Sequence, residues 1–278
     1  MTITRVGTGL ALLGALVAAL SACGHTGPSA QSPERQAEAE YDLARDYFYK
    51  GEQRAALDHA LKAVDLDDSN AKALYFTSEL FLAFCAGNEG LTASDCKLAK
   101  AEQYARKAIS QDDAFRDAKN LLGNVLILEN KYKDAIEVLQ PLVKDPSYTA
   151  SYLAWGNLGW AQVQDGSIDQ GIASLKNAVT QPKFCVGYYR LGVAYDKKGD
   201  LGQAEQSFTQ AVQVESPDCQ ALQDAWQARG EVRLKQNKRD VACQDLTRCR
   251  EISDQTASGK ACIQSMTKAG CAQAAAHG

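Results

Sequence analysis

Hydrophobic residues along this chain recur three or four positions apart, and the helices that this spacing predicts come in pairs. The apolar and aromatic side chains of residues 41–51 follow the pattern up to Gly51, and an alanine-rich run with the same period comes next. This period is typical of amphipathic helices that pack against a core. Alternation of apolar and polar residues, which would predict a strand, does not extend over any useful length. The sequence therefore predicts an all-α fold.

The helical pairs repeat, and each pair contains two small residues at a fixed separation. In five pairs these residues are 12 positions apart, and in one pair they are 23 apart. Small side chains allow two antiparallel helices to approach closely where they cross. The paired positions, called crossing residues below, are Ala44 with Ala56, Ser78 with Ala101, Gly123 with Ala135, Gly159 with Gly171, Gly192 with Ala204 and Gly230 with Ala242. The equal spacing predicts six helical hairpins and disfavours the alternative, an unrelated bundle of alanine-rich helices.

Helix-breaking residues separate the predicted helices. Gly51, Gly166 and Gly199 can adopt the left-handed conformation that ends a helix, so we place them in the turns within hairpins. Prolines at positions 146, 182 and 217 fall between hairpins. A last helix, from about residue 255 to residue 268, is expected to cap the open apolar end of the array. The six copies are expected at about residues 37–70, 71–115, 116–149, 150–184, 185–218 and 219–250.

The first 22 residues have the pattern of a secretory signal. Arg5 supplies a positive charge, residues 6–20 form an uncharged apolar run, and the sequence LSAC follows, ending at Cys23. The run is shorter than the ~20 residues that a membrane-spanning helix needs. The LSAC segment resembles the lipobox of bacterial lipoproteins, which implies cleavage before Cys23 and a lipid anchor on that cysteine. The alternative is an ordinary signal peptide with an incidental cysteine.

The residues after Cys23 indicate to which membrane the anchored protein is sent and where the folded array begins. Gly24 stands where an Asp usually marks retention in the inner membrane. We therefore expect the protein to be anchored at the periplasmic face of the outer membrane. Residues 24–36 are rich in Gly, Pro, Ser and Gln and predict a flexible tether. The expected organisation is a signal peptide at 1–22, a lipidated cysteine and tether at 23–36, the repeat array at 37–250, and a capping helix and tail at 251–278.

Composition and charge narrow the class of function. The formal net charge is −4 and no basic stripe stands out, which disfavours nucleic-acid binding. The three histidines, His25, His59 and His277, lie in no recognisable catalytic motif, and the exported part has no glycine-rich phosphate loop. We therefore expect no catalytic residue, metal, cofactor or small-molecule substrate. A pocket with paired carboxylates inside the array is the feature that would favour an enzyme.

The cysteines predict disulfide bonds. Of nine cysteines, eight remain beside Cys23, and an even number in an exported protein is typical of disulfide pairing. The long spacing of the second pair comes from 11 extra residues bracketed by Cys85 and Cys96, so we predict that these two are bonded. Cys185 and Cys219 stand at the starts of neighbouring copies and form the second predicted bond.

The last four cysteines allow two pairings. Antiparallel packing of the last hairpin against the cap favours the nested choice, Cys249 with Cys262 and Cys243 with Cys271. The crossed choice stays open. A zinc site is disfavoured because closely spaced CxxC pairs are absent.

The crossing residues and the turn glycines together resemble the tetratricopeptide repeat (TPR). The resemblance implies a right-handed superhelical array of about six repeats with a C-terminal capping helix and with the first helix of each pair on the concave side. Such surfaces accept segments of partner proteins. Positions on these helices outside the crossing are therefore predicted to bind a partner, unless they pack between neighbouring helices instead: Tyr41, Arg45, Phe48, Tyr75, Glu79, Leu82, Asn120, Asn124, Trp160 and Tyr189.

A narrower resemblance is to the type IV pilus pilotins, the PilF/PilW/Tgl family. It involves Leu122-Gly123-Asn124, Tyr132, Ala135, residues 144–148 and Asn157-Leu158-Gly159. It implies an outer-membrane lipoprotein that helps secretin subunits insert and form their ring. The insertion between Cys85 and Cys96 departs from the enterobacterial-style pattern and looks more like the Tgl branch. The alternatives are a general TPR scaffold for cell-envelope assembly and an accessory that holds a periplasmic hydrolase.

Overall fold

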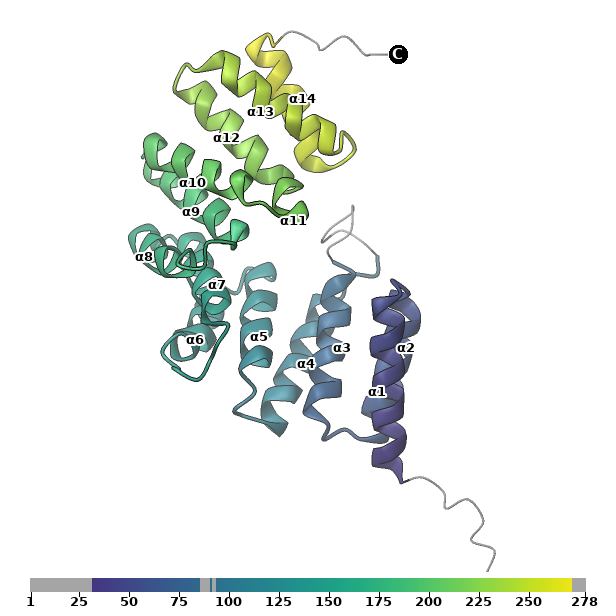
Figure 1. Cartoon of the computed structure of the whole chain (residues 1–278). Coiled ribbons are helices and arrows are strands. Elements are labelled where there is room, and N and C mark those ends of the chain that lie inside the picture. Colours follow the sequence, from purple (N-terminus) through teal and green to yellow (C-terminus); the bar gives the residue numbers. More distant parts are fainter. Residues whose placement is uncertain (1–31, 86–90, 92–93, 272–278) are drawn as a thin grey trace, which may run out of the picture.

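The computed structural model describes residues 32–85, 91 and 94–271, and this part of the chain forms fourteen helices and no strand. Twelve of these helices form six antiparallel hairpins, a short α11 (Pro217–Gln220) precedes the last hairpin, and α14 (Ala257–Ala269) follows it (Figure 1). The predicted all-α array of TPR hairpins is confirmed. The hairpins are α1 (Pro33–Tyr49) with α2 (Gln53–Leu66), α3 (Ala71–Ala83) with α4 (Leu98–Gln111), α5 (Arg116–Leu128) with α6 (Tyr132–Leu142), α7 (Ser151–Gln164) with α8 (Ile168–Ala178), α9 (Cys185–Lys198) with α10 (Leu201–Gln213), and α12 (Gln223–Lys235) with α13 (Arg239–Ile252).

The array begins four residues earlier than the sequence predicts. Ser32 caps α1 by accepting a hydrogen bond from the backbone N–H of Arg35, and Pro33 occupies the first turn, where no N–H donor is needed. The predicted signal peptide, Cys23 and the tether up to residue 31 lie outside the described residues. Among the described helices, none is long and apolar enough to cross a bilayer.

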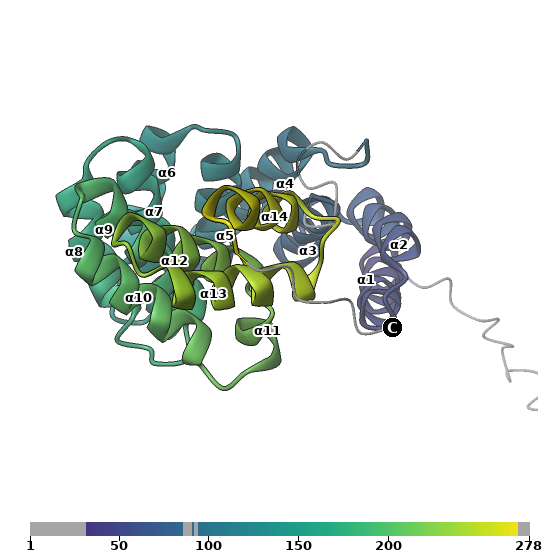
Figure 2. The ribbon, with the colours of Figure 1, turned by 90° about the horizontal axis from the view of Figure 1, so that it is seen from above.

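The hairpins stack into a curved array (Figures 1 and 2). We call the first helix of each hairpin its A helix and the second its B helix. Each B helix packs against its own A helix, and each of the first five B helices also packs against the A helix of the next hairpin. The A helices α3, α5, α7 and α9 also contact one another in turn. This arrangement leaves the A helices to form the inner side of the curve.

The crossing residues are buried in all six hairpins, at the positions that the spacing predicts. In the second hairpin the Ser78 hydroxyl donates a 2.7 Å hydrogen bond to the carbonyl of Ala101, 23 residues later. The crossing is therefore intact, although 11 extra residues separate its two members in the sequence.

A second position on each B helix, four residues after its crossing residue, completes the crossing. In the last four hairpins the A-helix residue is glycine, and a Cβ there would come within 2.6–2.9 Å of a large B-helix side chain. In the first two hairpins the A-helix residue has a Cβ, and the B-helix residue at the equivalent position is alanine. Volume on one helix is thus matched by space on the other. The pairs are Ala44–Ala60, Ser78–Ala105, Gly123–Leu139, Gly159–Leu175, Gly192–Phe208 and Gly230–Leu246.

In five hairpins, a residue with positive φ occupies the same position in the turn between the two helices. Gly51, Gly166 and Gly199 have φ of +79°, +90° and +86°, so the predicted left-handed turns are confirmed. Asn130 and Asn237, each with φ of +60°, occupy the same position, seven residues after the crossing residue. Asparagine tolerates this conformation better than other non-glycine residues because its short polar side chain can hydrogen-bond locally. These two turns lack the glycine that marks the other three, so glycine alone does not predict them.

Eight cysteines form four disulfides in the structure. Cys85–Cys96 closes the insertion, and Cys185–Cys219 links α9 to α11. The remaining two bonds have the nested arrangement: Cys249–Cys262 joins α13 to α14, and Cys243–Cys271 joins α13 to the second residue after α14.

The capping helix covers the apolar end of the array. Cys262 and Met266 of α14 pack with Leu246 and Cys249 of α13 in one buried cluster. The Thr256 side chain caps α14, and its hydroxyl also donates to the buried amide of Gln223, whose Nε2 in turn donates to the carbonyl of Cys249. The cap is thus joined to both helices of the last hairpin.

We expect Gly192→Ala to destabilise the protein, although alanine favours helix formation by up to ~1 kcal/mol. The new Cβ would lie 2.6 Å from the Phe208 ring, and overpacking of a core costs about 1–3 kcal/mol. Gly202→Ala is the matched control, because the nearest atom to that Cβ is Asp200 Oδ1 at 3.7 Å. Thermal melts should show a lower midpoint for Gly192→Ala alone. Equal or higher stability of Gly192→Ala would contradict the crossing contact.

The nested pairing can be tested by tryptic mapping without reduction. Cleavage places Cys243 in peptide 240–248, Cys249 in 249–250, Cys262 in 261–268 and Cys271 in 269–278. We expect 240–248 linked to 269–278, and 249–250 linked to 261–268. Peptide 240–248 linked to 261–268 would show the crossed pairing and exclude the nested one.

Candidate functional site

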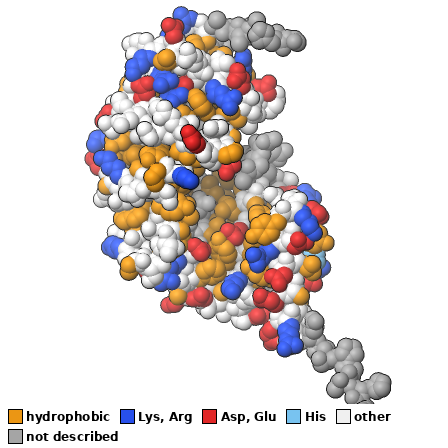
Figure 3. Space-filling model, in the orientation of Figure 1, with side chains coloured by type: hydrophobic (Ala, Val, Ile, Leu, Met, Phe, Trp, Pro, Cys, Tyr) orange, Lys and Arg blue, Asp and Glu red, His pale blue; other side chains and the backbone are white. Residues whose placement is uncertain are grey.

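The inner side of the array contains a groove of about 320 Å³. Its walls come from the A helices α3, α5, α7 and α9, together with the loop before α7 and the residue before α9. Figure 3 shows hydrophobic side chains gathered in a hollow on this side, with charged side chains around it. The lining residues are Tyr75, Glu79, Asp117, Asn120, Leu121, Asn124, Tyr148, Leu153, Asn157, Phe184, Val186 and Arg190.

Helix geometry explains which residues reach the groove. On α5, the lining residues lie six, three and two residues before the crossing residue Gly123 and one residue after it; they are Asp117, Asn120, Leu121 and Asn124. Residues three or four apart share one face of a helix, so these positions form a single stripe. The same offsets from Gly159 and Gly192 place Asn157 and Arg190 in the groove. The crossing contact therefore also determines which side chains line the groove.

One end of the groove is acidic. The Tyr75 hydroxyl donates a 2.6 Å hydrogen bond to Oε1 of Glu79, and Asp117 lines the same wall from α5. Burial raises the pKa of Glu79, and the negative charge of Asp117 raises it further. No cation among the described residues forms an ion pair with Glu79, whose only hydrogen-bond donor there is Tyr75. We call Tyr75, Glu79, Asp117 and Tyr148 the acidic end.

Tyr148 adds a buried hydroxyl to this end. Its side chain is 6% exposed, and within the described part of the chain its hydroxyl makes no hydrogen bond of normal geometry. Burial raises the pKa of Tyr148, and the nearby Asp117 carboxylate acts in the same direction. A buried hydroxyl without a partner costs free energy, so this group is suited to a hydrogen bond with a bound molecule.

A chain of polar side chains crosses the middle of the groove. Nη1 of Arg190 donates to Oδ1 of Asn157 at 2.8 Å, and Nδ2 of Asn157 donates to Oδ1 of Asn120 at 3.1 Å. These three residues belong to α9, α7 and α5. Carboxamide side chains can both donate and accept, which suits the N–H and C=O groups of a peptide backbone. We call this row the amide ladder.

Arg190, which is half-buried, differs from the buried Arg229 in its charge partners. Arg229 is 7% exposed, lies 4.8 Å from the Trp226 ring centroid and makes two hydrogen bonds, of 3.0 and 2.7 Å, to the buried carboxylate of Asp245. Arg190 lies 5.8 Å from the Trp160 ring centroid but forms no ion pair with any described carboxylate. Burial lowers the pKa of Arg190 to about 10. Its positive charge is therefore held in the groove without a compensating anion from the described residues.

The structure brings four of the ten predicted partner-binding residues into this groove: Tyr75, Glu79, Asn120 and Asn124. The other six lie elsewhere. Leu82, Trp160 and Tyr189 are half-buried and pack against core clusters.

The remaining three predicted residues lie on α1. Tyr41 and Phe48 pack against the Phe76 ring with centroid separations of 5.9 and 5.6 Å. Arg45 is exposed, lies over the Tyr41 ring and is 3.9 Å from the carboxylate of Asp42. For Tyr41, Phe48, Leu82, Trp160 and Tyr189, packing between helices describes the observed contacts.

Sequence reasoning missed Asp117, Asn157, Arg190 and Tyr148. The first three lie six or two residues before a crossing glycine, so counting one more turn along each A helix would have found them. Tyr148 has no such signal, because it lies in the loop between α6 and α7 and reaches the groove only through the folding of that loop.

Glu79 and Asp117 are paired carboxylates inside the array, the feature that would favour catalysis. The groove is open to solvent, however, and its other polar groups are amides, phenols and one guanidinium. No cluster of three or more metal-ligating side chains occurs in the described ranges. Two carboxylates beside a buried hydroxyl fit the binding of a cationic group better than proton transfer in an enclosed site.

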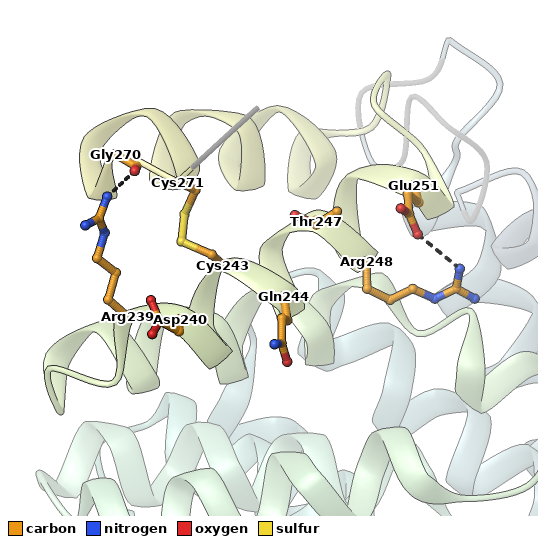
Figure 4. Close-up of a pocket in the computed structure, with 9 residues that line it drawn as sticks. All are labelled: Arg239, Asp240, Cys243, Gln244, Thr247, Arg248, Glu251, Gly270 and Cys271. Atoms are coloured by element: carbon orange, nitrogen blue, oxygen red, sulfur yellow. Dashed lines mark hydrogen bonds and ion pairs between the residues drawn. A yellow bond between two sulfur atoms is a disulfide. The ribbon is translucent and has the colours of Figure 1, made fainter. Parts of the chain in front are cut away.

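A second depression lies at the C-terminal end, between α13 and the end of α14 (Figure 4). It measures about 570 Å³, and the Cys243–Cys271 bond forms one wall. Arg239 donates to the carbonyl of Gly270, and Arg248 lies 3.6 Å from Glu251. Both arginines thus have partners, and the contacts of Arg239 and of the disulfide hold the cap in place.

Comparisons with known proteins agree with this fold. A family model for the tetratricopeptide repeat matches residues 187–218, within the fifth hairpin and the turn after it. A search among curated proteins found no significant sequence match.

Three solved structures are similar to this chain over more than nine tenths of their own length. The crystal structure of PilW, described as a widely conserved type IV pilus biogenesis factor, is 18% identical with a TM-score of 0.67 and covers 82% of this chain and 98% of its own. The structure of Pseudomonas aeruginosa PilF is 16% identical with a TM-score of 0.63 and covers 83% of this chain and 97% of its own. YrrB, described as a TPR protein with an unusual peptide-binding site, is 22% identical with a TM-score of 0.50 and covers 69% of this chain and 91% of its own. At these identities the likeness establishes a TPR fold similar to those of PilW and PilF.

We expect Glu79→Gln to raise the melting temperature at pH 7.5 and to have little effect near pH 3.5. The pKa of Glu79 is raised in the folded protein, so the wild-type protein loses stability as the pH rises above the ordinary carboxyl value of 4.5. Glutamine avoids this loss and can still accept the Tyr75 hydrogen bond. Thermal melts across this pH range provide the measurement, with the exposed Asp113→Asn as the control. A stability difference independent of pH would show that Glu79 is not destabilised by its charge.

Proposed function

We propose that this protein is an outer-membrane lipoprotein that acts as a pilotin, binding a secretin and assisting its assembly during type IV pilus biogenesis. The observation on which this depends is the correspondence with PilW over 98% of that chain, because PilW is described as a type IV pilus biogenesis factor. PilF corresponds over 97% of its length. A match over so much of both chains concerns the whole array rather than a single repeat.

The anchor in this proposal rests on the sequence before α1. The apolar run at 6–20 and the LSAC segment fit a lipoprotein signal, and the described array begins only ten residues after Cys23. Acyl chains contribute ~0.8 kcal/mol per buried CH₂, so more than one chain holds a protein firmly at a membrane. A short tether at the start of α1 would keep the array close to the membrane where a secretin assembles.

The groove supplies the binding surface. It combines apolar side chains, amides, two carboxylates and a guanidinium in one open concave site formed by four A helices. Concave TPR surfaces of this kind accept extended or helical segments of other proteins. The proposed role is therefore non-catalytic.

The proposal can be tested in cells from which the gene has been deleted. We expect fewer secretin multimers in the outer membrane of the deletion strain, with recovery when the wild-type protein is restored. Cys23→Ala should move the protein to the soluble periplasmic fraction because it removes the site of acylation. Ser29→Ala, a change in the predicted tether, is the matched control and should leave fractionation unchanged.

Two results would count against separate parts of the proposal. Normal secretin multimers in the deletion strain would remove the pilotin role and favour a general scaffold. Unchanged outer-membrane fractionation of Cys23→Ala would refute the lipid anchor at that residue.

A further inference from the structure

We infer that the groove selects a partner segment by its charge order: the acidic end binds a lysine or arginine side chain, and Arg190 binds a carboxylate farther along the same segment. The inference rests on the proposed function in so far as the groove binds a polypeptide, and it specifies the chemistry of that polypeptide.

The acidic end is built for a cation. Glu79 and Asp117 come from neighbouring A helices and line the same wall. Glu79 is half-buried and Asp117 is exposed, and the negative charge of Asp117 raises the pKa of Glu79. A bound ammonium or guanidinium would relieve this repulsion. Glu79 accepts its hydrogen bond from Tyr75, which leaves carboxylate lone pairs for a donor from the partner.

Tyr148 provides an independent indication that the acidic end is incomplete. Its hydroxyl is buried, belongs to the groove wall and makes no hydrogen bond of normal geometry within the described residues, although the Asp117 carboxylate lies near it. Native structures satisfy most buried polar groups, so an exception in a concave site points to a missing ligand. A segment that seats a basic side chain between Glu79 and Asp117 would bring its own polar groups close to this hydroxyl.

At the opposite end of the groove, Arg190 lacks a partner of opposite charge among the described residues. Its only described hydrogen-bond partner is the neutral carbonyl oxygen of Asn157, whereas Arg229, the buried arginine of the last hairpin, has the carboxylate of Asp245. A desolvated guanidinium without an anion is costly, and a planar carboxylate satisfies it with two parallel hydrogen bonds. The partner must supply that carboxylate, because the described part of the chain supplies none.

The amide ladder fixes the order of the two charges. Asn120 and Asn157 lie on α5 and α7, between Glu79 on α3 and Arg190 on α9. Their carboxamides can hydrogen-bond the backbone of a segment that passes over them. A bound segment therefore places its basic residue towards α3 and its acidic residue towards α9, and a segment with the reverse order would meet repulsion at both ends.

The test uses the mature lipidated protein in detergent and a phage-displayed library of random 12-residue peptides. We expect the selected peptides to contain one basic and one acidic residue in a constant order. Arg190→Gln should remove the preference for the acidic residue only. The double variant with Glu79→Gln and Asp117→Asn should remove the preference for the basic residue only.

Affinities of the best peptide then test the pairing directly. Each groove variant should weaken binding about tenfold, and replacing the matching peptide charge should cause no further loss in that variant. Lys119→Gln and Asp113→Asn are the matched controls, because each removes one charge of the same sign outside the groove. They should bind like the wild type, and all variants should retain the wild-type circular dichroism spectrum.

Peptides without a charge preference, no selected peptides, or equal binding by wild-type and groove variants would each overturn the inference. The outcome is distinguishable from that of the pilotin experiment. Charge-ordered binding in a protein that secretin assembly does not need would leave the inference standing for another partner. Dependence of secretin assembly on the protein without any charge preference would refute the inference alone.

Discussion

The close crossing of the two helices in each hairpin is the contact on which the rest of the structure depends. A glycine in the A helix leaves room for Leu139, Leu175, Phe208 or Leu246, and an alanine or serine there is matched by Ala60 or Ala105. Because interiors are close-packed, such matching fixes the separation of the two helices. Groove residues lie at constant offsets from the same A-helix residue, so the contact that closes the hairpin also orients the side chains that face a partner.

Arg229 and Arg190, the first buried and the second half-buried in the groove, differ in whether the protein itself neutralises their charge. Arg229 and Asp245 are both buried and neutralise each other, so a buried ion pair joins α12 to α13. Arg190, Glu79 and Asp117 have no such compensation among the described residues. Glu79 and Arg190 are half-buried, so their uncompensated charges lower the stability of the free protein, and a partner that supplied the opposite charges would recover that free energy on binding.

The sequence could predict most features that depend on local spacing. Crossing residues, glycine turns and the cap were all readable because each hairpin repeats the same short pattern. The turns at Asn130 and Asn237 were missed because the pattern was read for glycine alone. The groove was predicted in part. Tyr75 and Asn120 lie in the groove, as expected for positions on A helices outside the crossing, whereas the large side chains of Trp160 and Tyr189 are half-buried and pack against a core cluster. Tyr148 could not be predicted, since a loop conformation has no periodic signal.

Two disulfides lie at the C-terminal end of the array. An end hairpin has only one neighbour, so it buries less apolar surface than an interior one. Two of the four disulfides tie α13 to the segment at and after α14, where the buried cluster has only Leu246, Cys249, Cys262 and Met266. Covalent links there offset a small core by restricting the unfolded chain. The groove, by contrast, lies on the second to fifth hairpins, each supported on both sides. Side chains that must keep uncompensated charges in position are best held there, because rigid neighbours prevent the helices from moving to relieve them.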